Sequence, residues 1–189
     1  GGPPIPPYDV TGHTLGLLMG VEVAQIETPV NADLELLETI EPVFKPLPTR
    51  PNWAYAINPS SNAGFLAASR LQAANVPIYR ASNWFEVNGQ EYAPGSWLIE
   101  PTEETESILE AVAVETGLVI QGIDAPVNVA GYRLQDSTRV GLWRAANNMP
   151  GGWMLWLFEQ YELNHTVISS TDFDGELSEK YDVIVPPSG

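Results

Sequence analysis

A chain of 189 residues is long enough to bury one well-filled hydrophobic core or two small ones. Its 24 acidic and 8 basic side chains give a formal net charge of −16 at pH 7. Such a balance repels a phosphate backbone and an anionic membrane surface, so we expect no nucleic-acid partner. The absence of cysteine excludes disulfides, thiolate metal sites and a cysteine nucleophile. No apolar run approaches the ~20 residues that a membrane span requires.

Residues 1–52 are predicted to form a linker, a short helix and a strand. Residues 1–7 contain four prolines and no basic residue, which is typical of an extended linker and unlike a signal peptide. Thr11 is placed to cap a short helix that ends at Gly20. A strand is expected over residues 21–30, and an acidic, proline-rich connection follows it.

Residues 53–131 are predicted to form a first α/β unit with a hairpin insertion. Asn88 and Gly89 lie between two β-rich runs, which is a strong signal for a type I′ turn. Thr102 is the expected N-cap of a helix that Gly117 ends. The other expected elements are strands at 53–57, 76–81, 96–100 and 118–122, a helix at 63–74 and a loop at 124–131.

Residues 132–189 are predicted to form a second α/β unit. The pattern gives strands at 139–143, 165–169 and 181–186, a helix at 153–161 and a short helix around Leu177. The repeated strand–helix–strand order predicts an α/β fold of mostly parallel strands with flanking helices, flavodoxin-like or Rossmann-like. A parallel sheet usually continues into a helix after such a strand, so we expect the last unit to be incomplete and the chain to be part of a longer protein.

The sequence predicts no catalytic residue, metal ligand or cofactor site within this chain. His13 and His165 belong to no spaced ligand set. Residues 170–175 imitate the start of an EF-hand loop, but Tyr181 stands where the bidentate glutamate is needed. A short helix capped by Thr171 or Asp172 is the better interpretation of that stretch.

A binding site for a sugar or small anion is the open alternative, at the carboxyl ends of the predicted parallel strands. Pro150, Gly151 and Gly152 follow a strand and open a helix, but they lack both the dinucleotide-binding glycine spacing and a P-loop lysine. Trp153 and Trp156 are three residues apart on one predicted helix, where an apolar packing role is favoured over binding a sugar. The candidate ligand-binding residues are Trp143, Arg144, Asn147, Asn148 and Trp153.

Two stretches resemble one protein family. Residues 8–21, YDVTGHTLGLLMGV, are similar to a "YDVT-x-x-T-L-x-L-x-MGV" segment downstream of the peptidase domain in large bacterial zinc carboxypeptidase-like proteins. Residues 152–161, GWMLWLFEQY, with residues 181–185, YDVIV, resemble a "GW-x-x-W-x-x-E-Q-Y … YDVIV-x-P" block near the C-terminal end of those proteins. The resemblance covers nearly the whole chain in the same order.

The resemblance implies a non-catalytic accessory region of a secreted or periplasmic protein. In that family, the corresponding region is similar to a class I glutamine amidotransferase-like, flavodoxin-like domain without amidotransferase chemistry. Zinc is held in the preceding peptidase domain, whose His-x-x-Glu motif does not occur here, so no catalytic residue can be transferred. The implied partners are that peptidase domain and a peptide or carbohydrate. A free-standing binding module and a structural or oligomerisation domain remain as alternatives.

Overall fold

The computed structural model describes residues 44–134, 138–145 and 148–187, together with Gly16, Val21, residues 23–36 and residues 38–39. The chain divides into two units, Gly1–Ile40 and Glu41–Gly189. Val21 and residues 23–30 are not a strand, so that prediction is wrong. Val23, one of the residues expected to point inward from that strand, is 70% exposed. Apart from Gly16, which is helical, the helix expected over residues 11–20 lies outside the described residues.

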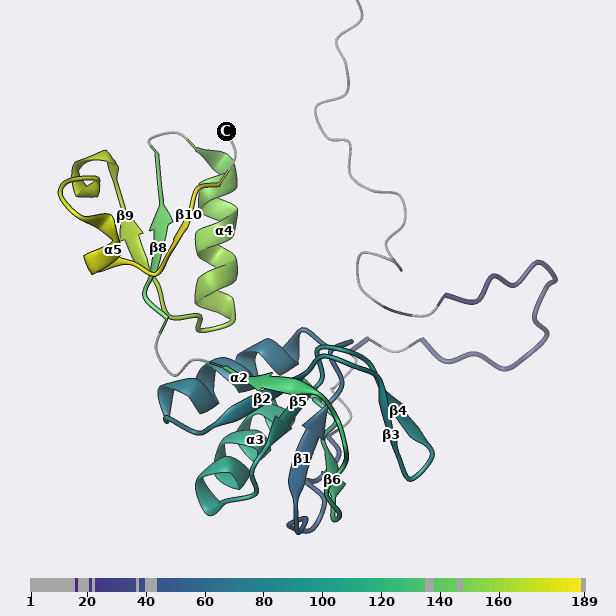
Figure 1. Cartoon of the computed structure of the whole chain (residues 1–189). Helices are drawn as coiled ribbons and strands as arrows, with labels where there is room; N and C mark the ends of the chain where they lie inside the picture. The colour runs from purple at the N-terminus through teal and green to yellow at the C-terminus, as the bar shows by residue number, and fades with distance from the viewer. Residues whose placement is uncertain are drawn as a thin grey trace, which may run out of the picture. The chain divides into compact units, whose positions relative to one another are not determined.

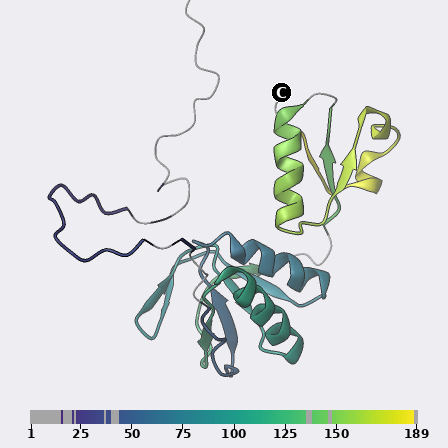
Figure 2. The same cartoon turned by 180° about the vertical axis from the view of Figure 1, so that it is seen from behind.

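The larger sheet of the second unit has five strands in the order β6–β1–β5–β2–β7. All four strand pairs in it are antiparallel. Figure 1, and Figure 2 from behind, show that two helices lie together on one face of this sheet. The elements are β1 (Ala54–Ile57), α2 (Ala63–Ala73), β2 (Ile78–Ala81), β5 (Trp97–Ile99), α3 (Glu103–Thr116), β6 (Gln121–Ile123) and β7 (Gly131–Arg133).

This sheet overturns the predicted fold class, because it is neither mostly parallel nor flavodoxin-like or Rossmann-like. β1 and β2 do run in the same direction, as a strand–helix–strand unit requires, but β5 lies between them and is antiparallel to both. In the same way, β5 and β6 flank β1. The result is a split, ferredoxin-like β-α-β-β-α-β arrangement, with β7 added at the edge beside β2.

The strand boundaries near the end of the predicted first α/β unit, residues 53–131, also differ from the prediction. β6 begins at Gln121 and not at Leu118. β7 occupies Gly131–Arg133, whereas no strand was predicted between residue 122 and residue 139. Leu118 and Ile120 are buried although they precede the strand. These two apolar side chains therefore belong to the core, although their backbone is not part of the strand.

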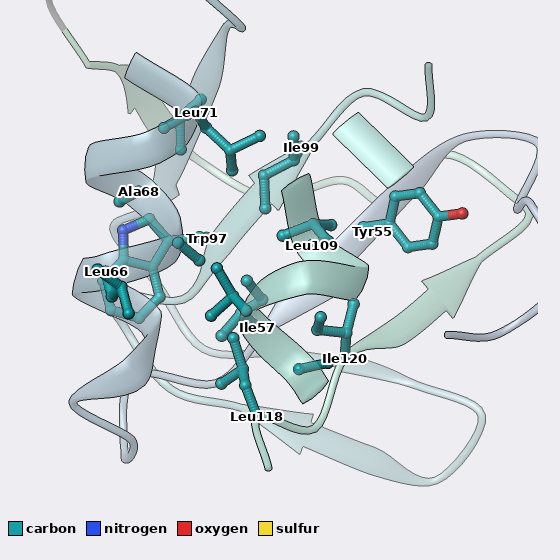
Figure 3. Packing of buried hydrophobic residues seen from close by; sticks show 14 of the residues in the cluster. Tyr55, Ile57, Leu66, Ala68, Leu71, Trp97, Ile99, Leu109, Leu118 and Ile120 are labelled. Atoms are coloured by element: carbon teal, nitrogen blue, oxygen red, sulfur yellow. The ribbon is translucent and has the colours of Figure 1, made fainter. Parts of the chain in front are cut away.

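The core of the larger sheet lies between its strands and the helices α2 and α3 (Figure 3). Tyr55 and Ile57 on β1 point to this side, and Trp97 and Ile99 on β5 do the same. Because side chains alternate along a strand, the residues between them face the opposite side of the sheet. The small side chain of Ala56 there packs in a second cluster with Phe85, Tyr92 and Leu98, among others.

The predicted caps at Thr102 and Gly117 and the predicted turn at Asn88 and Gly89 are confirmed. Thr102 is the N-cap of α3, where its hydroxyl accepts a hydrogen bond from the Thr105 amide at 3.1 Å. Gly117 ends α3 with a φ of 72°. Between β3 (Phe85–Val87) and β4 (Gln90–Tyr92), Asn88 and Gly89 have φ angles of 52° and 78°, as a type I′ turn requires.

A smaller sheet carries the last stretch of the chain. Its three strands, β8 (Val140–Trp143), β9 (Thr166–Ile168) and β10 (Val183–Val185), are parallel and lie in the order β10–β8–β9. The parallel pairing predicted for this stretch is confirmed, for these three strands only. Helix α4 (Met149–Gln160) connects β8 to β9, and η1 (Ser170–Asp172) and α5 (Leu177–Lys180) lie between β9 and β10.

Candidate functional site

The candidate site lies where β8 and β9 end side by side. Trp143 and Ile168 are paired at the ends of these strands, and the Arg144 amide donates to the Ile168 carbonyl at 2.9 Å. The residues that follow each strand therefore diverge from a common edge. They line a hollow of about 880 Å³, which we call the strand-end hollow; its lining residues are Trp143, Arg144, Ala145, Asn148, Met149, Ser169 and Ser170.

Three of the five predicted ligand-binding residues line this hollow: Trp143, Arg144 and Asn148. Asn147 lies outside the described residues. Trp153 does not line the hollow; it lies on α4, is 64% exposed, and its ring meets that of Trp156 edge to face at 6.1 Å. Trp156 is itself 49% exposed, so the two rings pack against each other on the surface of α4 and not in the interior.

Asn148 shapes the hollow as the N-cap of α4. Its side-chain oxygen accepts a hydrogen bond from the Gly151 amide at 2.9 Å, and its backbone carbonyl accepts one from the Gly152 amide at 3.2 Å. Pro150 has no N–H to offer. Both glycine amides are therefore already hydrogen-bonded within the first turn of the helix. An anion in this hollow would therefore find no free amide at Gly151 or Gly152.

Arg144 is the exposed cation of the hollow. Within the part of the chain that the structure describes, its guanidinium forms no ion pair and no hydrogen bond. Other arginines contrast with it. Arg50 pairs with Glu106, Arg70 pairs with Glu115 and Glu162, and Arg139 pairs with Asp182. In a chain of net charge −16, a positive side chain without a carboxylate partner is conspicuous.

Ser169 and Ser170 line the hollow and were not among the predicted residues. Asp172 holds this turn in place, because its carboxylate accepts hydrogen bonds from the Ser169 amide at 2.7 Å and the Ser169 hydroxyl at 2.8 Å. These bonds lower the pKa of Asp172. Ser169, rather than Thr171 or Asp172, is thus the N-cap of η1. The serines were predictable in principle, since they follow β9 as Arg144 follows β8.

The stretch that imitates an EF-hand loop is held by an ion pair. Lys180 pairs with the Asp174 carboxylate and also donates to the Asp174 carbonyl at 3.1 Å. This pairing lowers the pKa of Asp174. Among the described residues, no group of three or more histidine, aspartate or glutamate side chains could hold a metal ion.

A second hollow, of about 400 Å³, adjoins the first and shares Trp143 and Ser170 with it. We call it the apolar hollow, since its other lining residues are Phe173, Ile184 and Pro186. The rings of Trp143 and Phe173 meet edge to face, with centroids 6.0 Å apart. Trp143 therefore contributes to the wall of both hollows.

Another hollow, of about 660 Å³, lies on the larger sheet beside Trp53, Tyr79 and Leu98. Arg80 is among its lining residues, but its guanidinium is already engaged. Arg80 donates to the Gly95 carbonyl at 3.0 Å, and its guanidinium lies 4.6 Å from the centre of the Trp97 ring. The strand-end hollow is therefore the better candidate for an anion.

Comparisons of the chain with models of protein families, with curated proteins and with solved structures find no match. None of the helices in the described ranges has the length and apolar content that a transmembrane span requires.

Proposed function

We propose that this chain is a non-catalytic binding module whose strand-end hollow takes a small anion. The observation that carries the proposal is the position of Arg144, which lines the hollow without a carboxylate partner among the described residues. A guanidinium presents paired N–H donors that match the oxygens of a carboxylate or phosphate. Ser170 adds a hydroxyl, and Trp143 adds a flat apolar wall.

The overall charge of the chain limits which anions can bind. With a net charge of −16, the protein repels anions at long range, and the repulsion grows with the charge on the ligand. Small ions of low charge are therefore favoured over polyanions, whose many phosphates would meet an acidic surface. Salt screens this long-range term, while the contact with Arg144 acts at close range.

Calorimetric titration of the full chain with acetate and with inorganic phosphate tests the anion proposal. We expect saturable heat for at least one of the two and a loss of affinity of about tenfold or more in Arg144→Ala. Lys45→Ala is the matched control, because it removes one positive charge from an exposed side chain outside the hollow. Arg144→Lys keeps the charge without the planar fork and should bind with intermediate affinity.

Glucose serves as a neutral probe in the same titration. Saturable heat with glucose, and none with either anion, would show that the ligand is a sugar and that the anion proposal is wrong. Equal binding of anions by the wild type and by Arg144→Ala would show that the ions bind elsewhere, and the assignment to this hollow would then be wrong.

We further propose that this module is an accessory region of a zinc carboxypeptidase-like protein. The support is the ordered resemblance of residues 8–21, 152–161 and 181–185 to that family. In this proposal, the zinc and the peptide hydrolysis belong to a separate peptidase domain, against which this region packs in a secreted or periplasmic protein. The reading frame that encodes the chain tests it, because a frame without an upstream peptidase-sized region contradicts the family assignment.

The non-catalytic role has its own test. The 189-residue chain is incubated with short peptides, with and without added zinc, and the products are analysed by mass spectrometry. We expect no release of C-terminal residues in either case. Zinc-dependent release would make the chain itself the peptidase.

A further inference from the structure

We infer that the ligand of the strand-end hollow is an oxyanion joined to an aromatic or branched aliphatic group, and that this group occupies the apolar hollow. The inference rests on the proposed function, and it adds the chemical class of the ligand. It comes from the juxtaposition of two hollows of opposite character, one bearing Arg144 and the other walled by Phe173, Ile184 and Pro186.

Trp143 stands at the boundary of the two hollows, since it lines both. It is the last residue of β8, and the next residue, Arg144, lines the strand-end hollow. Ser170 is the other shared residue, at the start of η1. A ligand that spans this boundary would place its charged end beside Arg144 and its other end beside Phe173.

The apolar hollow has the composition of a site for a hydrocarbon group. Four of its five lining residues have apolar or aromatic side chains, and Ser170 is the one hydroxyl among them. Phe173 is 44% exposed, so a group that enters the hollow removes aromatic surface from water. A second charged or strongly polar group would lose its hydration there without finding a partner.

Scattered apolar side chains are common on protein surfaces, so the exposure of Phe173 alone would carry no conclusion. The class of ligand follows from the position of the two hollows next to each other. A small inorganic anion satisfies Arg144 and leaves the apolar hollow in contact with water. A neutral hydrocarbon fills the apolar hollow and leaves the guanidinium unpaired. Only a ligand with both parts uses both sites.

Two pairs of probes test the inference by calorimetry on the full chain. Phenylacetate is compared with acetate, and phenyl phosphate with inorganic phosphate, so that the effect of the aromatic group is measured for each kind of anion. We expect the aromatic member of at least one pair to bind about tenfold more tightly, because burial of part of a phenyl ring is favourable. The pair with the tighter complex identifies carboxylate or phosphate as the head group.

Phe173→Ala should remove most of the preference for the aromatic probe and leave the affinity for the small anion unchanged. Phe44→Ala is the matched control, since Phe44 is also partly exposed, at 42%, and lines neither hollow. Phe173→Leu keeps an apolar wall and should retain part of the preference. Near-ultraviolet circular dichroism verifies that each variant keeps its tertiary packing.

The outcomes separate this inference from the proposed function. Equal affinity for aromatic and small anions overturns the inference and leaves anion binding intact. No binding of any probe overturns both. A preference for aromatic probes that survives both Phe173→Ala and Arg144→Ala places the aromatic ligand elsewhere, and the inference is then wrong.

Discussion

Arg139 and Asp182 join the starts of β8 and β10 through a two-pronged ion pair. The Arg139 guanidinium donates to one carboxylate oxygen of Asp182 at 2.7 Å and to the other at 3.1 Å. The Arg139 amide donates to the same carboxylate at 2.8 Å, and the Asp182 amide donates to the Arg139 carbonyl at 2.9 Å. This contact links residues 43 positions apart in the sequence and fixes the register of the parallel pair.

The ion pair predicts a loss of stability in acid. The hydrogen bonds from Arg139 lower the pKa of the Asp182 carboxyl to about 2, against about 3.9 for an unfolded aspartate. Because the folded state favours the ionised form, its contribution is complete above about pH 4 and is lost as the pH falls through about 2. Asp182→Asn should be less stable than the wild type near neutral pH, and the difference should shrink over this acid range.

Thermal unfolding followed by circular dichroism at a series of pH values measures this difference. Asp33→Asn is the control, because Asp33 is exposed in the first unit and should leave the acid limb unchanged. A constant gap between the wild type and Asp182→Asn from neutral to acid pH would show that the carboxylate does not carry the effect.

Gly64→Ala should destabilise the protein although it replaces glycine in a helix. In an exposed helix this change gains about 0.5–1 kcal/mol. At position 64, however, the added Cβ would lie 2.6 Å from Cζ3 of Trp97, whose side chain is fully buried. Overpacking of a rigid core costs about 1–3 kcal/mol, so the net effect should be a loss.

Gly152→Ala is the matched substitution in α4, where a Cβ meets nothing within 4 Å. We expect it to be neutral or to stabilise by up to about 1 kcal/mol. Urea unfolding of both variants gives the comparison. Equal effects of the two substitutions would mean that the contact between position 64 and Trp97 has no energetic weight.

Thr102→Ala should lower the stability of the larger sheet and its helices by about 1 kcal/mol, the usual effect of losing an N-cap. The hydroxyl accepts the Thr105 amide at 3.1 Å and lies 2.9 Å from the Thr105 hydroxyl, which is fully buried. Thr102→Ser retains the oxygen and should recover most of the loss in urea unfolding. A serine variant as unstable as the alanine variant would exclude the cap as the cause.

Tyr55 should titrate late in alkali. Burial, followed by the hydrogen bond that its hydroxyl donates to Glu106 at 2.9 Å, raises its pKa to about 12. The protonated form is thus favoured in the folded state. Its contribution to stability is complete below the unfolded pKa of about 10 and is lost as the pH rises through about 12.

Ultraviolet absorbance of tyrosinate measures this titration. Tyr55→Phe should remove a late-titrating tyrosine, and Glu106→Gln should move it part of the way back, because burial of the ring remains. Burial also raises the pKa of Tyr92, so late absorbance should persist in part. An unchanged late step in Tyr55→Phe would contradict the assignment.

Much of the local structure and part of the site were predictable. The type I′ turn at Asn88 and Gly89 and the cap at Thr102 depend on the backbone preferences of a few adjacent residues, which the sequence states directly. Trp143 and Arg144 were predicted at the candidate site because ligands of parallel α/β sheets bind at the carboxyl ends of the strands. The rule applies to this stretch because β8 and β9 are parallel.

Other features of the site required the tertiary structure. Asn148 was predicted as a ligand residue, but its oxygen is used by the Gly151 amide. Phe173 and Ile184 come from separate segments, and only folding brings them beside Trp143. Trp153 carries the same apolar signal as a core residue, yet its side chain is exposed on α4.

The sequence alone determined the order of strands and helices, both from β8 to β10 and in the strand–helix–strand segments before them. Apolar periodicity, caps and turns depend on residues close together in the chain. The direction of pairing in the larger sheet was decided only by the tertiary structure. The strand–helix–strand pattern of β1, α2 and β2 is the same whether the two strands are neighbours or flank a third. The insertion of β5 between them depends on contacts of Trp97 and Ile99 with residues far away in the chain, which no local pattern specifies.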